Sequence, residues 1–393
     1  MGRSGHTMIY FDHNASTPVR PEAAEAVRRA LEELSANPAS AHREGQRARA
    51  AVERAREQVA RLVGAGTGEV VFVSGGTEGD HAAVVGAALA LWPRGQRVAL
   101  SAVEHHAVHG AGELLARVGF AVDHLPVDGA GRVDPREVDD LPAGTTLVSV
   151  MLANNETGVI QPVREVARRA AQRGLRLHCD AVQAAGKIPV DCEELGADYL
   201  VISAHKLGGP KGVGALVVRG GAPLEPLLRG SSHEGGRRGG TENVPGIVGF
   251  GAAAECAARD LASEFERLGA LRSRLESSIR AGCPDAVIHG EGVARLPNTV
   301  NVSIPGARSD HMLLALDARG IAISAGAACA SGAVEPSPVM KAMGVPRELA
   351  VCALRLSMGR TTTEAEVDTV AAALVECARR ARAMPVAAGG AGA

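Results

Sequence analysis

The stretch YLVISAHKLGGPKG, residues 199–212, decides the fold class of this chain. Residues 199–203 form a continuous run of apolar and β-branched side chains, which is typical of a strand covered on both faces. Lys206 follows that strand and precedes a glycine-rich turn. A lysine in this setting is held in place and partly desolvated, which lowers the pKa of its amine and makes it a usable nucleophile for a Schiff base. Taken alone, the segment would also suit an ordinary solvated loop lysine.

The same strand signal recurs on both sides of this stretch. Short apolar runs lie at 69–73, 97–100, 120–125, 146–152, 175–179 and 213–218, and most are separated by helical stretches such as 163–173. Charge-paired stretches at 21–34 and 41–62 predict helices ahead of the first strand. This alternation indicates a mostly parallel sheet with helices on its faces, and such sheets bind ligands beyond the carboxyl ends of their strands.

The character of the chain changes after residue 219. A loop rich in glycine and arginine, LLRGSSHEGGRRGGTENVP, is followed by a long helical stretch at 247–279. Further strands at 299–304, 320–323 and 353–357, with helices at 310–318 and 363–382, predict a second domain. We therefore predict an α/β fold with a large domain at 18–250, built on a mostly parallel mixed sheet, and a smaller α+β domain made of 1–17 and 251–384. The low-complexity end, 385–393, is expected to be a disordered tail.

Composition limits the class of protein. The 393 residues are 46% hydrophobic and 22% charged, with a formal net charge of -2, so the charge balance does not call for nucleic acid or an anionic membrane. The seven cysteines are widely spaced without a CxxC pair, which argues against a disulfide framework or a zinc site. No apolar stretch approaches the roughly 18 residues of a membrane span. We expect a soluble, cytoplasmic protein without a metal.

Two further segments suit a pyridoxal 5′-phosphate (PLP) site around Lys206. Asp180 ends a strand in HCDAVQ, and PLP needs a carboxylate against its pyridine nitrogen because the protonated ring is an electron sink. Gln183 could reach the phenolic oxygen of the ring. The turn SGGT, residues 74–77, lies where a strand becomes a helix, so its backbone N–H groups and the helix dipole converge on an anion such as a phosphate. Singly, Asp180 could be a helix cap and the turn an ordinary one.

Ten segments, in order, carry a resemblance to a known family. They are FDHNASTPV, NPASAHREGQRAR, VSGGTE, VEHHAV, NNETGVIQP, HCDAVQAAGKIPVD, SAHKLGGPKGVGAL, HEGGRRGGTENVPGIVGF, NTVNVS and RLSMGRTTTEAEVD. From about residue 9 to residue 370 the chain resembles the cysteine desulfurases, which are fold-type I PLP-dependent transferases related to class V aminotransferases. The resemblance implies PLP-dependent removal of sulfur from L-cysteine, giving L-alanine and an enzyme persulfide.

The resemblance also implies roles for individual residues. Lys206 would carry PLP as the Schiff-base lysine, Asp180 would pair with the pyridinium, and Gln183 would contact the phenolic oxygen. His105 would lie against the ring and help to move protons. The phosphate would be bound by Gly76, Thr77, Ser203 and His205, and by Thr241 supplied from the other subunit of a homodimer. Asn155 and Arg355 would hold the substrate, and Arg355 would bind its carboxylate through a bidentate fork.

The sulfur chemistry points to a single cysteine. Cys329 lies in SAGAACASG, which resembles the cysteine loop of these desulfurases, and its thiolate would accept the sulfur and pass it to an acceptor protein. The other cysteines, Cys179, Cys192, Cys256, Cys283, Cys352 and Cys377, are expected to be small buried hydrophobes.

The sequence departs from the family pattern in places and leaves alternatives open. Asp80 and His81 follow the SGGTE segment where asparagines are usual, Cys179 replaces a small apolar residue, and Ala327 stands where serine is common. A PLP aminotransferase, a selenocysteine lyase and a sulfur-relay scaffold remain alternative functions. Arg229, Arg237 and Arg238 could form a patch for an anionic partner instead of a dimer-interface loop. Iron–sulfur clusters, tRNA, DNA and cofactors are all possible destinations of the sulfur.

Overall fold

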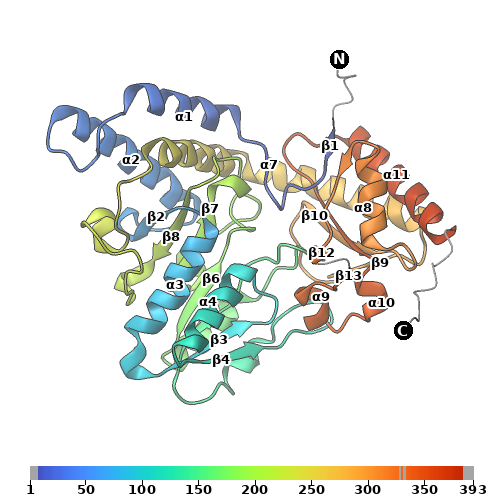
Figure 1. The fold of residues 1–393 in the computed structure, drawn as a ribbon, viewed down its shortest axis with the longest axis horizontal. Helices are drawn as coiled ribbons and strands as arrows, with labels where there is room; N and C mark the ends of the chain where they lie inside the picture. Colours follow the sequence, from blue (N-terminus) through green and yellow to red (C-terminus); the bar gives the residue numbers. More distant parts are fainter. Residues whose placement is uncertain (1–7, 327–328, 331–332, 384–393) are drawn as a thin grey trace, which may run out of the picture.

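The computed structural model describes residues 8–326, 329–330 and 333–383, which form a larger and a smaller part joined by one long helix (Figure 1). The larger part is built on a seven-stranded sheet with the strand order β2-β8-β7-β6-β5-β3-β4. The strands are β2 (Val70–Val73), β3 (Arg97–Ser101), β4 (Ala121–Leu125), β5 (Thr145–Ser149), β6 (Arg176–Asp180), β7 (Tyr199–Ser203) and β8 (Gly214–Val218). Strand β8 is antiparallel to both its neighbours, and the other pairings are parallel. The predicted mostly parallel mixed sheet is therefore confirmed.

Helices cover both faces of this sheet because the strands alternate their side chains between two cores. On β7, Leu200 and Ile202 belong to one apolar cluster, whereas Tyr199 and Val201 belong to another on the opposite face. The second cluster packs under α3 (Gly76–Ala90) and α4 (His106–Arg117). The first lies under α2 (Arg43–Leu62), α5 (Val163–Gln172), α6 (Cys192–Leu195) and the start of α7 (Val244–Gly282), and α1 (Pro21–Glu33) packs on α7.

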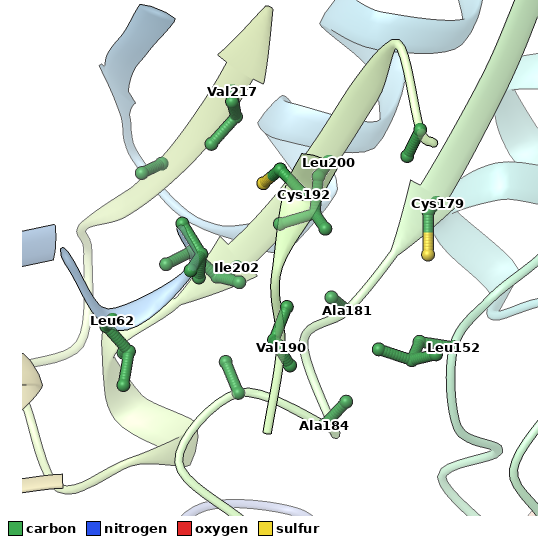
Figure 2. Packing of buried hydrophobic residues seen from close by; sticks show 14 of the residues in the cluster. Leu62, Leu152, Cys179, Ala181, Ala184, Val190, Cys192, Leu200, Ile202 and Val217 are labelled. Atoms are coloured by element: carbon green, nitrogen blue, oxygen red, sulfur yellow. The ribbon is translucent and has the colours of Figure 1, made fainter. Parts of the chain in front are cut away.

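The buried cysteines belong to these cores. Cys179 and Cys192 lie among Leu152, Ala181 and Leu200 in the first cluster (Figure 2). Each of the two is fully buried, and desolvation raises the pKa of each thiol, which disfavours the thiolate. The expectation that Cys179, Cys192, Cys256, Cys283, Cys352 and Cys377 are buried is confirmed.

The smaller part holds a second, mainly antiparallel sheet with the order β14-β10-β9, made of β14 (Ala353–Ser357), β10 (Thr299–Ser303) and β9 (Val287–Ile288). Near the amino terminus, β1 (Ile9–Tyr10) pairs in parallel with β11 (Ile321–Ala322). The helices of this part are α8 (Ser309–Asp317), α9 (Pro338–Ala342), α10 (Arg347–Ala350) and α11 (Glu364–Ala383). A two-stranded hairpin is formed by β12 (Cys329–Ala330) and β13 (Ala333–Val334).

Helix α7 joins the two parts because it contributes to both apolar cores. Its first half supplies Phe250 and Ala254 to the large core, and its second half supplies Leu275 and Ile279 to the small one. The helix begins before the predicted residue 247 because the side chain of Asn243 caps it by accepting from the Gly246 N–H (3.2 Å). The boundary between residues 250 and 251 falls inside this helix and stays a prediction.

Other expectations concern the chain ends and the membrane. The predicted disordered tail at 385–393 lies outside the described residues. Among the residues that the structure describes, no helix is both long and apolar enough to span a membrane, and no cluster of His, Cys, Asp and Glu is arranged to hold a metal ion.

Candidate active site

A cavity of about 360 Å³ opens at the edge of the large sheet where the strands that run in the common direction end. Asp180 is the last residue of β6, Ser203 is the last residue of β7, and Gly76 begins the helix after β2. The smaller part of the molecule contributes Arg355 from β14. The residues that line the cavity are Asn14, Ala15, Gly76, Thr77, Asp80, His105, Met151, Asn155, Asp180, Val182, Gln183, Ser203, His205, Lys206 and Arg355. The structure thus brings most of the predicted site residues together.

Lys206 lies directly after β7, as the sequence predicts, and its amine is held at the cavity wall. Its Nζ donates to the backbone carbonyl oxygens of Asn14 (2.6 Å) and Ala15 (2.9 Å). Partial burial, together with the positive charge of Arg355, lowers the pKa of Lys206 to about 8. Near pH 8 about half of the Lys206 amines are therefore neutral and nucleophilic, whereas an ordinary lysine with a pKa of about 10.4 is almost entirely charged.

Asp180 is nearly enclosed in the wall of the same cavity. It is 5% exposed, and its Oδ1 accepts from the backbone N–H of Val182 (2.8 Å). Burial, reinforced by the neighbouring Asp80, raises the pKa of Asp180 to about 7. A cation placed against this carboxyl group would restore its ionised form.

Asp80, together with a buried histidine, is among the parts of the site that the sequence analysis missed. Asp80 is 1% exposed and lines the cavity, and its Oδ1 lies 3.4 Å from Nε2 of His178 without a hydrogen bond. Nδ1 of His178 is bonded to Ser149 Oγ (2.8 Å), and burial lowers the pKa of His178 to about 4. Burial also raises the pKa of Asp80. The one available signal was the unusual aspartate after SGGTE, which did not by itself reveal where the side chain would lie.

The third side of the cavity has the features of an anion cradle. Helix α3 starts at Gly76, so its N-terminal N–H groups and dipole face the cavity beside the hydroxyl of Thr77. A Cβ at position 76 would approach Val182 Cγ2 to 3.1 Å, so a side chain here would need Val182 to shift by a few tenths of an ångström. Ser203 Oγ is buried and has no hydrogen-bond partner among the described residues. His205 contacts Ser16 Oγ through Nδ1 (3.3 Å), which leaves Nε2 for a ligand.

His105 caps the amino end of α4, and that role fixes its tautomer. Its Nδ1 accepts from the backbone N–H of Ala107 (3.1 Å), so the neutral ring carries its proton on Nε2. The ring is exposed to the open cavity, yet partial desolvation and the charge of Lys206 lower its pKa. At neutral pH His105 is therefore a neutral ring that can donate from Nε2.

Arg355 crosses from the small domain into the cavity and is almost completely buried. Its NH2 group pairs with Asp12 Oδ1 (2.6 Å) and its NH1 group donates to the backbone carbonyl of Asn155 (3.2 Å). The Nε–H has no partner among the described residues. A donor left unpaired in a buried guanidinium suits a carboxylate ligand.

Two predicted residues do not line this cavity. Thr241 lies beside a separate depression of about 130 Å³ with Ser74, Gly212 and Arg238. The backbone of Cys329 belongs to β12, but its side chain is outside the described part of the chain. The roles given to these two residues remain predictions.

The residues that are present fit PLP. Ser203 Oγ, Asp80 Oδ1 and Arg355 Nε are buried polar atoms without partners, and all three residues line the cavity. The donor set also matches the chemistry of the group, because an anion cradle, a nucleophilic amine and an enclosed carboxyl lie around one space. We conclude that the cavity can accept a phosphate, an aldehyde carbon and a ring nitrogen at once.

The chain is similar in sequence and in structure to proteins that belong to one family. A model of the family described as aminotransferase class-V matches residues 9–370. The chain is 43% identical to the cysteine desulfurase IscS of Dictyoglomus turgidum over 361 residues, 92% of each chain. It is 45% identical to the cysteine desulfurase IscS of an Anaeromyxobacter species over 380 residues, 96% of this chain and 94% of the relative. A solved structure of a NifS-like protein superposes with a TM-score of 0.88 at 38% identity, covering 94% of this chain and 99% of that one.

The lowered pKa of Lys206 can be tested on the cofactor-free protein. A lysine whose pKa is lowered exposes a neutral amine at lower pH, so the rate of acetylation of Lys206 by acetic anhydride should rise with a midpoint near pH 8. The extent of labelling is read by mass spectrometry of the peptide that contains Lys206. A midpoint near the ordinary value of about 10.4 would show that the cavity does not perturb this amine.

Proposed function

The chain belongs to the aminotransferase class-V family and is a PLP-dependent cysteine desulfurase, and from this premise we propose that Lys206 is the lysine that holds the cofactor. The observation that carries the proposal is the position of its amine, which has a pKa of about 8 and lies in one cavity with Asp180 and the start of α3. Of the described residues that line that cavity, Lys206 is the one lysine.

The other residues of the cavity would each bind a different group of the cofactor. Asp180 would pair with the ring nitrogen and Gln183 would donate to the phenolic oxygen, while the phosphate would be bound by Gly76, Thr77, Ser203 and His205. When bound, PLP supplies an electron sink for the negative charge that develops at the substrate Cα. The neutral amine of Lys206 then serves as the base that takes the Cα proton. His105 lines the same cavity and would lie against the ring, where its Nε2–H could donate.

The substrate, L-cysteine, is bound through its carboxylate. Arg355 offers the unpartnered Nε–H and the adjacent NH2 group, and this fork matches the two carboxylate oxygens. Asn155 lines the cavity beside it. Asp12 already accepts from the guanidinium at 2.6 Å, which holds the side chain of Arg355 in place before the substrate arrives.

Cys329 receives the sulfur. Its thiolate attacks the sulfur of the substrate, a new sulfur–sulfur bond forms, and the Cβ–S bond of the substrate breaks. The bonding electrons stay with the carbon fragment, which takes up a proton and leaves as L-alanine. L-cysteine and the Cys329 thiol are thus converted to L-alanine and a Cys329 persulfide, with atoms and electrons in balance.

The Cys329 step can be separated from cofactor binding. The variant Cys329→Ala should keep the visible absorbance of the bound cofactor but lose persulfide formation, with sulfide release under reducing conditions falling by about 100-fold or more because a reacting group is gone. Mass spectrometry of the intact protein after one turnover reads the added sulfur atom. Cys283→Ala, which removes a buried thiol of the small core, is the matched control and should behave as the parent. Parental sulfide release by Cys329→Ala would exclude a persulfide on this residue.

We further propose that the active enzyme is a homodimer in which each subunit supplies Thr241 to the phosphate of the other. Thr241 is supported as a residue that acts in trans because it lies at the surface depression beside Ser74 rather than in the cavity of its own chain. The arginines of the same loop are engaged within the chain: Arg238 pairs with Glu78 (2.8 Å), Arg237 donates to Gly68 O (2.9 Å), and Arg229 pairs with Glu225. These contacts favour an interface loop over a patch for an anionic partner.

A mixed dimer tests the exchange of Thr241. One subunit carries Lys206→Ala and the other carries Thr241→Ala. If Thr241 acts across the interface, the site that keeps Lys206 receives an intact threonine, so half of the sites recover the parental affinity for PLP. Equilibrium dialysis of the mixed and parent dimers gives the measurement. Cofactor affinity no better than that of the Thr241→Ala homodimer, or a monomeric mass by light scattering, would contradict the proposal.

The persulfide sulfur then passes to an acceptor protein in the cytoplasm. Iron–sulfur cluster assembly, tRNA or DNA sulfur modification and cofactor synthesis are the candidate routes, because each can use persulfide sulfur from a cysteine desulfurase, the name that the relatives carry. No direct contact with nucleic acid or with a membrane is proposed, because the net charge of -2 offers no basic field.

A further inference from the structure

We propose that Lys187 is a positioning residue for the same reaction: it fixes the side-chain amide of Gln183 as a hydrogen-bond donor that faces the cofactor. The inference rests on the proposed function, in which Gln183 contacts the phenolic oxygen of PLP. It adds a residue that does not line the cavity and that acts through another side chain.

The contacts of Lys187 place its ammonium group behind Gln183. Its Nζ donates to Gln183 Oε1 (2.6 Å) and to Asn14 Oδ1 (3.2 Å). Lys187 and Gln183 are four residues apart on consecutive turns, so their side chains lie on one side of the chain. Gly186, with a φ of +75°, sits between them in a conformation that a side chain would strain.

The amide of Gln183 can take only one orientation in this setting. Its other terminal atom lies 2.9 Å from the carbonyl oxygen of Asn14, which can accept but not donate, so that atom is Nε2. Oε1 must then face Lys187. One of the two Nε2 hydrogens is bonded to Asn14, and the second remains free for the cavity that Gln183 lines.

Lys187 does more than fix the orientation. An N–H donor bonded to Oε1 polarises the amide and strengthens the donor at Nε2, because hydrogen bonds in a chain reinforce one another. A stronger donor at Nε2 makes a negative charge on a phenolic oxygen beside Gln183 more favourable and a proton on a neighbouring imine nitrogen less favourable.

The surroundings of Lys187 show that the position is costly for an ordinary structural lysine. Burial lowers its pKa well below the usual value, and the nearby charges of Lys206 and Arg355 add to that effect. His13 and His205 are the titratable neighbours on the other segments packed against it. Among the described residues its hydrogen-bond acceptors are two amide oxygens and no carboxylate.

The amino-acid composition of the chain also supports a special role for Lys187. The chain has 42 basic residues, of which only four are lysines (Lys187, Lys206, Lys211 and Lys341). Two of the four lie within one hydrogen-bonded group around Asn14. A lysine presents a compact ammonium group, which reaches two amide oxygens in a space that a planar guanidinium does not match.

The experiment titrates the visible absorbance of the cofactor bound to the purified holoenzyme. In Lys187→Met the pH midpoint should move upward by about half to one pH unit, because the weaker donor at Nε2 of Gln183 favours the protonated imine. Lys341→Met is the matched control: Lys341 is exposed on α9, where it pairs with Glu335, and the midpoint should stay at the parental value. If Lys187→Met does not fold, Lys187→Gln takes its place, with a smaller shift in the same direction.

A double-mutant cycle shows whether Lys187 acts through Gln183. Adding Lys187→Met to Gln183→Ala should move the midpoint by clearly less than in the parent background, because the two residues then form one unit. An unchanged midpoint in Lys187→Met, or equal shifts in both backgrounds, overturns the inference while the proposed function stands. If Lys206→Ala keeps the same visible absorbance as the parent, the proposed function itself has failed, so the two failures are distinguishable.

Discussion

The structure depends on one buried amide, that of Asn14, whose polar groups must all be satisfied away from water. The residue is 1% exposed. Its backbone carbonyl accepts from Lys206 and Gln183, and its side-chain oxygen accepts from Lys187 and Asn298. Its side-chain nitrogen donates to Thr299 Oγ1 (2.9 Å) and its backbone N–H to Ser357 Oγ (2.9 Å). The hub therefore joins the large sheet, the small sheet and the reactive lysine.

Asn14 lies in the short segment after β1. This segment therefore forms part of the site and does not merely connect two elements. Asp12 holds Arg355 from the smaller part, and the carbonyls of Asn14 and Ala15 hold Lys206 from the larger one. Helix α7 supports the same arrangement on the outside, because it packs into both apolar cores (Figure 1). The relative position of the two parts, the guanidinium of Arg355 and the amine of Lys206 are thus set by one network of contacts.

Much of the fold could be predicted from local pattern, and so could the part of the site that depends on it. Residues 199–203 and 353–357 are strands with the predicted bounds, since apolar runs of that length have few other stable conformations. Asp180, Ser203 and Gly76 converge because strands that run in one direction end at one edge. Asp80 and Asn14 escaped the sequence analysis because their partners are distant, as in the bond between Asn14 and Ser357, 343 residues apart. Lys187 escaped it because, although Gln183 is four residues away, its other partner, Asn14, is 173 residues away.

The central claim is that this network prepares Lys206, and no other lysine, to hold the cofactor. Reduction of the holoenzyme with borohydride fixes PLP to the amine that carries it, and peptide mapping by mass spectrometry then identifies that amine. The account predicts a phosphopyridoxyl group on Lys206 in nearly all of the protein. A phosphopyridoxyl group on Lys187, Lys211 or Lys341 instead would contradict it.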